Sequence, residues 1–168
     1  DPQNVLTLRL SLPGAQYNSA AKVFAFYDAV LQRVSALPGV QHAGAAYQTP
    51  FTEGADSSMF HIRGRESGPG QAPPHADYAF VSADYFPAIG LQIVQGRGFQ
   101  PSDVRGGNSI PPNSVAIIDE ELARRFWPNG DAIGSGISWS KDGPWATVVG
   151  ISRTAQVKDL TEPSKGTF

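Results

Sequence analysis

The chain has 168 residues, of which 40% are hydrophobic, so it can bury the core of a single domain or of two small lobes. Its net charge is −2, and no stretch interleaves Lys and Arg with aromatic residues, which argues against nucleic-acid binding. It has no Cys, which excludes disulfides and thiolate metal sites but fits a cytosolic and a periplasmic protein equally well.

The glycine and proline content and the hydropathy pattern indicate further properties of the chain. Its 18 Gly and 14 Pro predict many ordered loops rather than disorder. No apolar run approaches the roughly 18 residues that a membrane-spanning helix needs, and no signal-peptide pattern occurs, so we expect a soluble chain. Because it opens with Asp1-Pro2 rather than Met and reaches a strand pattern almost at once, we expect a piece of a longer polypeptide.

The first third of the chain is predicted to be β-α-β. Leucines alternate with polar residues over 5–12, the period of a half-buried strand. Asn18 or Ser19 can cap the helix that follows, and Pro38-Gly39 ends it. The small residues over 40–47 predict a second strand that packs closely under a covering helix. The apolar stripe of the helix comprises Val23, Tyr27, Val30, Leu31, Val34 and Leu37.

The residue pattern changes in the middle of the chain. Short β-like pieces around 58–64, 78–82 and 91–94 are separated by connectors rich in Gly and Pro, which predicts an inserted, mostly β lobe. Residues 66–74 carry no periodicity, so we expect a hairpin tip or loop there, and a functional role for this loop stays open.

A second β-α-β passage follows. We predict a strand over 114–118, a helix over 119–126, and strands near 136–139 and 145–151. The helix begins with acidic residues and ends with Arg124-Arg125, an arrangement that suits the helix dipole. The similar order of elements on both sides of the middle segment suggests two halves of one α+β sandwich, although no residue-level repeat is visible.

The sequence contains no recognisable reactive site. His42, His61 and His75 are the only histidines, and none has a second ligand at the spacing common in metal sites. The motifs of nucleophile elbows, zinc proteases and phosphate-binding loops do not occur. We therefore predict no catalytic, cofactor-binding or metal-binding residue and no cofactor.

Three polar or aromatic clusters have a structural and a functional interpretation. Asp119-Glu120-Glu121 can serve acid–base work or bind a cation, but at the start of a helix such residues are mostly caps. Phe126-Trp127-Pro128 and Tyr85-Phe86-Pro87 can offer aromatic surface to a ligand, but hydrophobic packing is favoured for both. Gly96-Arg97-Gly98 predicts a turn with positive φ, whose Arg can reach a carboxylate or a partner.

Five strings resemble the MacB-like periplasmic core domain of ABC transporter permeases, in order and in spacing, over nearly the whole chain. They are residues 4–12, ALPGV at 36–40, VSADYFPAIGLQIVQGRGF at 81–99, VAIIDEELARRFWPNGDAIGSGI at 115–137 and ATVVGISR at 146–153. They are packing and turn patterns, which identify a fold better than a cargo. The segments 105–113 and 138–145 do not map onto the family.

The resemblance implies an α+β fold with two lobes. A porter-like β-α-β lobe in two halves, residues 1–50 and 110–168, would carry an inserted mostly-β lobe, residues 51–109. Such a domain lies on the outer face of the bacterial cytoplasmic membrane, between the first and second transmembrane helices of a permease.

The resemblance also implies a role and partners. We expect a domain that relays ATP-driven conformational change to substrate export or to partner proteins. It would not be an enzyme, because a separate cytoplasmic ATPase domain or subunit hydrolyses ATP. The expected partners are the transmembrane helices of its own permease, the ABC ATPase indirectly, periplasmic proteins and a second copy in the permease. Contact residues are not predicted.

A second hypothesis belongs to another class. The chain can instead be a soluble module that binds a small ligand, or a hydrolase of an unrecognised type, with a pocket between the two lobes. Only the expected architecture supports this alternative.

Overall fold

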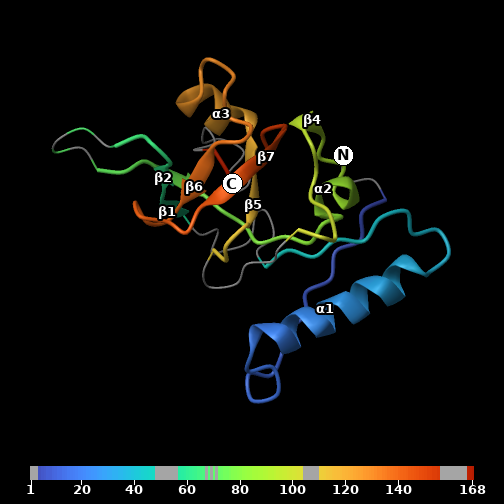
Figure 1. Cartoon of the computed structure of the whole chain (residues 1–168). Helices are drawn as coiled ribbons and strands as arrows, with labels where there is room; N and C mark the ends of the chain where they lie inside the picture. The colour runs from blue at the N-terminus through green and yellow to red at the C-terminus, as the bar shows by residue number, and fades with distance from the viewer. Residues whose placement is uncertain are drawn as a thin grey trace.

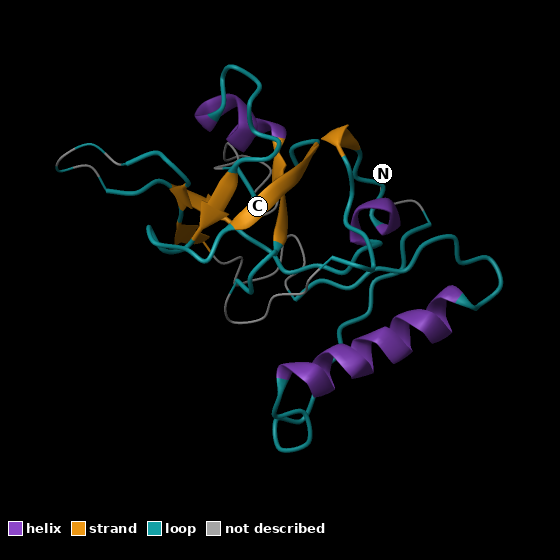
Figure 2. Ribbon diagram, viewed as in Figure 1, coloured by secondary structure: helices purple, strands orange, loops and turns teal. Residues whose placement is uncertain are grey.

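The computed structural model describes residues 4–47, 57–66, 68, 70, 72–103, 110–155 and 166–168. The helices are α1 (Ala20–Ser35), α2 (Tyr85–Ala88) and α3 (Glu120–Phe126), and the strands are β1 (Ser57–Met59), β2 (His61–Ile62), β3 (His75–Asp77), β4 (Ile93–Gly96), β5 (Val115–Asp119), β6 (Gly136–Ser138) and β7 (Ala146–Ser152). Figure 1 labels them along the chain, and Figure 2 distinguishes helices from strands. The expected α+β class is confirmed.

The main sheet has five strands organised around β7. Along β7, β5 pairs in parallel, whereas β6 pairs antiparallel with its first residues and β4 with its last. β2 extends the sheet beyond β6. β7 is rich in β-branched residues and β5 is mostly buried, as expected for a buried parallel pair.

A second, two-stranded sheet is formed by β1 and β3. The described residues 166–168 lie beside β3, where Thr167 forms a parallel bridge with Asp77. On their other side they meet the end of β5, because the Asp119 N–H donates to the Thr167 carbonyl at 2.9 Å. These three residues therefore connect the small sheet to the main one. We call them the 166–168 segment.

The core lies between the main sheet, α3 and the β1–β2 connection. Phe60, Ile118, Leu122 and Val148 are fully buried there. The remaining buried apolar residues of the cluster are Ile62, Ala76, Ala116, Trp127, Ala132, Ile137, Ala146 and Ile151. Apart from Gly166, every buried residue of the described chain falls between residues 60 and 152.

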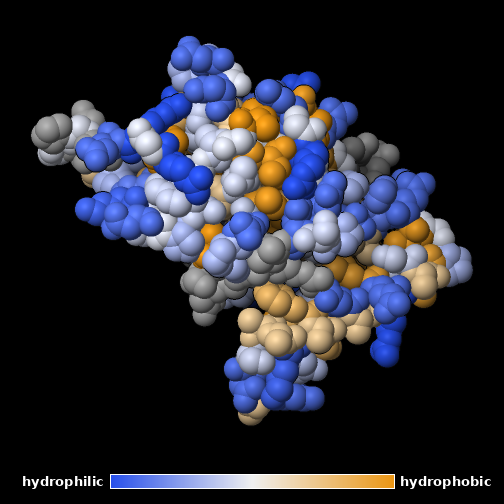
Figure 3. Space-filling view, viewed as in Figure 1, coloured by the Kyte–Doolittle hydropathy of each residue, from blue (hydrophilic) through white to orange (hydrophobic). Residues whose placement is uncertain are grey.

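The region of residues 4–47 contrasts with this core, since none of its residues is buried. α1 lies apart from both sheets at the lower side of Figures 1 and 2, joined to them by irregular segments. Apolar colour reaches the surface over α1 in Figure 3. Within the described part of the chain, no helix combines the length and the hydrophobicity needed to cross a membrane.

Local sequence signals placed several elements correctly. α1 begins after Ser19, whose hydroxyl accepts the Lys22 N–H, and Pro38-Gly39 follows its end, with Gly39 at φ +86°. The predicted strand 114–118 and helix 119–126 correspond to β5 and α3, and the two later strands to β6 and β7.

Two strand predictions in the first third are wrong. Residues 5–12 form no strand, because no described segment pairs with their backbone, and Leu6 and Leu8 are 96% and 79% exposed. Residues 40–47 contribute only one bridge, from Ala46 to Val81. Their small residues do allow close packing, since a Cβ on Gly44 would lie 2.6 Å from the Tyr85 Cα of α2.

The middle segment is only partly as predicted. β1, β2 and β4 lie at or near the expected positions, but the third strand, β3, covers 75–77 instead of 78–82. β2 and β4 belong to the same sheet as β6 and β7. The pairing therefore does not separate residues 51–109 from 110–168, and the division into two lobes stays a prediction.

Candidate functional site

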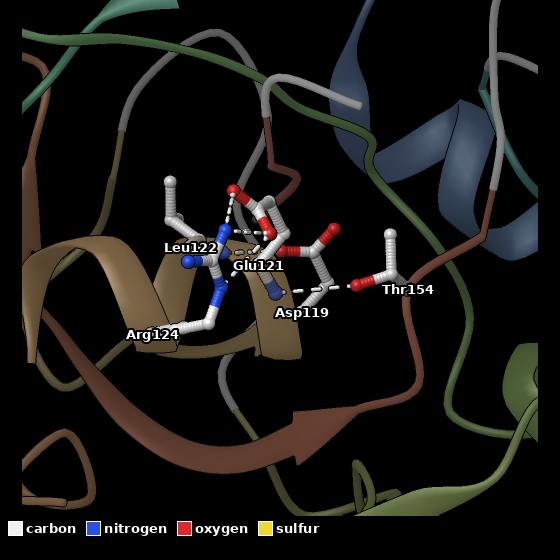
Figure 4. Close-up of polar contacts among 5 residues, drawn as sticks. All are labelled: Asp119, Glu121, Leu122, Arg124 and Thr154. Atoms are coloured by element: carbon white, nitrogen blue, oxygen red, sulfur yellow. Dashed lines mark hydrogen bonds and ion pairs between the residues drawn. The ribbon is translucent and has the colours of Figure 1, made fainter. Parts of the chain in front are cut away.

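The acidic cluster at the start of α3 forms a helix cap and ion pairs, and Figure 4 shows the contacts of Asp119 and Glu121. Asp119 Oδ1 accepts the Leu122 N–H at 2.8 Å. Glu121 forms an ion pair with Arg124 at 2.7 Å, and its backbone N–H donates to Thr154 Oγ1 at 3.2 Å. Glu120 pairs with Arg153 at 3.3 Å. The cluster therefore closes the first turn of α3 in the way that the sequence favoured.

Asp119 differs from the other two acids because its side chain is buried. It is only 3% exposed, and burial raises its pKa from 3.8 to about 6. The N–H groups of Leu122 and Thr167 act in the opposite direction, and the nearby charge of Glu121 raises the pKa further. The pKa of this carboxyl lies above the usual range of Asp because desolvation outweighs its hydrogen bonds.

The three histidines lie in different parts of the fold. His42 follows α1 in an irregular segment, His61 is in β2 opposite Ser138, and His75 is in β3 opposite Met59. Among the described residues, no group of three or more His, Cys, Asp or Glu side chains is arranged to hold a metal ion.

The Phe126-Trp127 cluster packs into the core as predicted, whereas Tyr85 and Phe86 lie outside the core cluster. Trp127 is buried, and the Phe126 ring meets Phe60 edge-on at 5.2 Å, so these side chains fasten the end of α3 to the core. Tyr85 and Phe86 are half-buried in α2, where Phe86 contacts the Phe99 ring at 5.9 Å. Burial raises the pKa of Tyr85.

Arg97 reaches a carboxylate, one of the two partners that the sequence suggested. Its guanidinium binds both Asp103 oxygens, at 2.8 and 2.9 Å, and holds the pKa of Asp103 below its usual range. Gly96 has φ +73°, and Asp103 also accepts the Gln100 N–H at 2.8 Å. The pair thus stabilises the turn that follows β4.

Two arginines after β2 that the sequence did not single out, Arg63 and Arg65, contact tryptophan rings from distant parts of the chain. Arg63 lies over the Trp145 ring at 5.3 Å, and Arg65 lies over the Trp127 ring at 5.5 Å. Arg65 also donates to the Phe126 carbonyl and lies 3.7 Å from Asp131. The sequence around these arginines shows only that they flank a glycine. The contacts could not be predicted from it, because the tryptophan partners are far along the chain. The alternative of a functional role for loop 66–74 stays open.

Residues 4–47 expose large apolar side chains that the rest of the described chain does not cover. Leu6, Leu8 and Tyr47 are the most exposed of them. α1 contains no buried residue, although the helix is amphipathic. We call this group the N-terminal apolar set. It consists of Val5, Leu6, Leu8, Leu10, Val34, Leu37 and Tyr47.

The contacts described above join arginines to aromatic rings, arginines to carboxylates, and capping side chains to the first turns of helices. The apolar set has the character of a contact surface.

Comparison with known proteins identifies the family. The MacB-like periplasmic core domain family matches residues 3–167. No curated protein matches the chain. Among solved structures, it is similar to the periplasmic region of MacB from Actinobacillus actinomycetemcomitans, with 19% identity and a TM-score of 0.49, over 82% of this chain and 59% of that one.

A second solved structure is similar. It is a domain assigned to a permease protein from Porphyromonas gingivalis, with 16% identity and a TM-score of 0.46, over 79% of this chain and 47% of that one. The chain thus spans about half to three-fifths of the length of these two structures. Because the family match covers nearly every residue, the chain belongs to the MacB-like periplasmic core domain family of ABC transporter permeases, which implies an extracytoplasmic location.

Proposed function

We propose that this chain is the part of a MacB-type ABC permease that relays ATP-driven conformational change to substrate export or to partner proteins outside the membrane. The observation that carries the proposal is the family match over residues 3–167. ATP hydrolysis would take place in a cytoplasmic ATPase domain or subunit. The transmembrane helices of the permease, periplasmic proteins and a second copy of the permease would be the partners.

The contrast within the fold supports this role. A relay needs one part that keeps its shape and another that contacts the moving partner. The main sheet has a dense core with buried β5 and β7, whereas residues 4–47 bury nothing and present the N-terminal apolar set. We propose that the N-terminal apolar set contacts the rest of the permease, and that 1–50 with 110–168 and 51–109 are the two lobes of the domain.

The absence of Cys makes a direct test of motion simple. Lys22→Cys in α1 and Lys141→Cys between β6 and β7 replace exposed residues and accept spin labels. Any cysteines elsewhere in the full-length permease would first be replaced. The distance distribution between the labels is then measured in proteoliposomes, without nucleotide and after trapping with ATP and vanadate. We expect the distribution to change on trapping, because the relay couples α1 to the state of the ATPase.

Matched variants connect the motion to the N-terminal apolar set. Leu8→Ser removes an exposed apolar side chain, and Arg9→Ser alters the neighbouring exposed position as a control. Leu8→Ser should reduce the nucleotide-dependent change and the coupled ATPase rate, while Arg9→Ser should leave both near the wild-type value. An unchanged distance distribution in the wild type, or full transport after deletion of the domain, would overturn the proposal.

A further inference from the structure

Backbone hydrogen bonds of the 166–168 segment connect the two sheets. Asp77 N–H donates to the Gly166 carbonyl at 3.0 Å, and Phe168 N–H donates to the Asp77 carbonyl at 3.0 Å. On the opposite side, Asp119 N–H donates to the Thr167 carbonyl at 2.9 Å. Three residues thus tie β3 of the small sheet to the end of β5 in the main sheet.

The fit of this segment against α3 is close. Gly166 has φ +86°, and a Cβ at this position would lie 2.8 Å from Leu122 Cδ1 and 2.9 Å from Leu122 Cβ. The Phe168 ring packs against Phe60 at 5.7 Å and Trp139 at 6.4 Å. The segment is therefore seated on the first turn of α3 and on the core, and cannot shift without opening the contact.

The carboxyl of Asp119 lies at this contact with an unmatched polar atom. Its Oδ1 accepts the Leu122 N–H, but its Oδ2 is buried and has no hydrogen-bond partner. The Thr167 Oγ1 is likewise buried and without a partner. An ionised carboxylate in this position leaves negative charge away from water, whereas a proton on Oδ2 removes that charge.

The other charged groups around this contact are already balanced or lie across the segment. On α3, Glu120 is paired with Arg153, which follows β7, and Glu121 is paired with Arg124. Asp77 of β3 lies on the far side of the 166–168 segment and has further interactions of its own. Among the described residues, no cation is paired with the Asp119 side chain.

We propose that protonation of the Asp119 side chain controls how tightly the 166–168 segment fastens the two sheets, so that this connection is tight at mildly acidic pH and loosens at neutral pH. This inference does not depend on the proposed relay. It adds a pH-sensitive device to the fold, placed where the small sheet meets the main one.

Proton linkage gives the direction in which pH changes the stability of this contact. Burial raises the pKa of Asp119 to about 6 in the closed contact, and when the segment opens, water restores the ordinary value near 3.8. The closed form therefore binds more protons than the open form between these values. The closed contact is fully stabilised below the open-state pKa and loses that stability as the pH rises through about 6. Between roughly pH 5 and pH 7.5, the open fraction should rise about tenfold.

Hydrogen exchange measures this opening residue by residue. The exchange rates of the Asp77, Asp119 and Phe168 amides would be followed by NMR at both pH values and divided by their intrinsic rates. We expect about tenfold less protection of these amides at the higher pH. The Val148 amide in β7, which reports on the main sheet, should change much less.

Two variants assign the effect. Asp119→Asn keeps a capping oxygen and carries no charge, so its protection should be the same at both pH values. Asp77→Asn should retain the wild-type pH dependence. If the dependence survives in Asp119→Asn, or vanishes in Asp77→Asn alone, a different group is responsible and the proposal is overturned.

A measurement on the wild type keeps the proposal testable even if a variant does not fold. The carboxyl carbon shift of Asp119 should titrate with a midpoint near 6. A midpoint below about 4, the range of an ordinary Asp, would remove the basis of the device.

Discussion

Residues 4–47 and residues 57–155 differ in whether their apolar side chains are buried. The second region buries every residue of the core, from Phe60 to Ser152, although its strands are short and irregularly spaced. The first has the cleaner sequence patterns, an alternating leucine segment and an amphipathic helix, yet buries none of its residues. A regular pattern therefore states which face of an element favours burial, but not which part of the chain covers it.

The largest test of this difference compares two apolar truncations. Ile118→Ala in β5 removes a side chain that is fully buried, and should reduce the free energy of unfolding by about 2–5 kcal/mol. Leu8→Ala removes a side chain that is mostly exposed, and should change it by less than about 0.5 kcal/mol. Urea unfolding followed by tryptophan fluorescence measures both, because all three Trp lie between 127 and 145.

Equal losses from the two truncations would contradict the comparison. They would mean that the leucine segment packs against the main sheet in solution. A loss from Ile118→Ala below about 1 kcal/mol would instead indicate that the core is much looser than its burial implies.

The same contrast explains what the sequence could predict. The β5–α3 unit was predictable because its signals are local. A buried apolar run is followed at once by the Asp119 cap and two more acids, and Arg124-Arg125 close the helix. The leucines of 5–12 carry an equally local signal, but a strand also needs a neighbouring backbone, and periodicity does not report one.

Contacts between distant segments account for most of what was missed. β3 has no β-branched residue, and forms because β1 pairs on it and the 166–168 segment lies beside Asp77. The stacking of Arg65 on Trp127 joins residues that are 62 positions apart. The raised pKa of Asp119 likewise requires burial under the 166–168 segment, whereas its capping role could be read from the residues that follow it.

A second test compares glycines that share a backbone conformation but not a neighbourhood. Gly96 of β4 has φ +73°, and a Cβ there would lie 2.2 Å from the Val149 carbonyl oxygen. Gly39 after α1 has φ +86° and open space around it. Gly96→Ala should reduce the unfolding free energy of the main sheet by about 2–4 kcal/mol, through backbone strain and overlap.

Gly39→Ala should introduce only backbone strain, which lowers the local stability at the end of α1 by about 1–2 kcal/mol. Its effect should appear as faster amide exchange at the end of α1, with the fluorescence transition unchanged. A shift of the fluorescence midpoint in Gly39→Ala as large as that in Gly96→Ala would show that the two regions unfold as one unit.

The smallest effect separates the two helix caps. Asp119 caps α3 with a buried bond of 2.8 Å, and Ser19 caps α1 with an exposed bond of 3.4 Å. Asp119→Ala should lower the unfolding free energy measured by fluorescence by about 1–2 kcal/mol. Ser19→Ala should lower only the local stability of α1, by about 0.5–1 kcal/mol, which would appear as a weaker helical circular dichroism signal. Because α1 has no buried residue to hold it, its sixteen residues depend on propensity and capping, and a lost cap frays it directly. If Ser19→Ala leaves the helical signal intact, something other than the described chain supports α1, and the N-terminal apolar set is covered in solution.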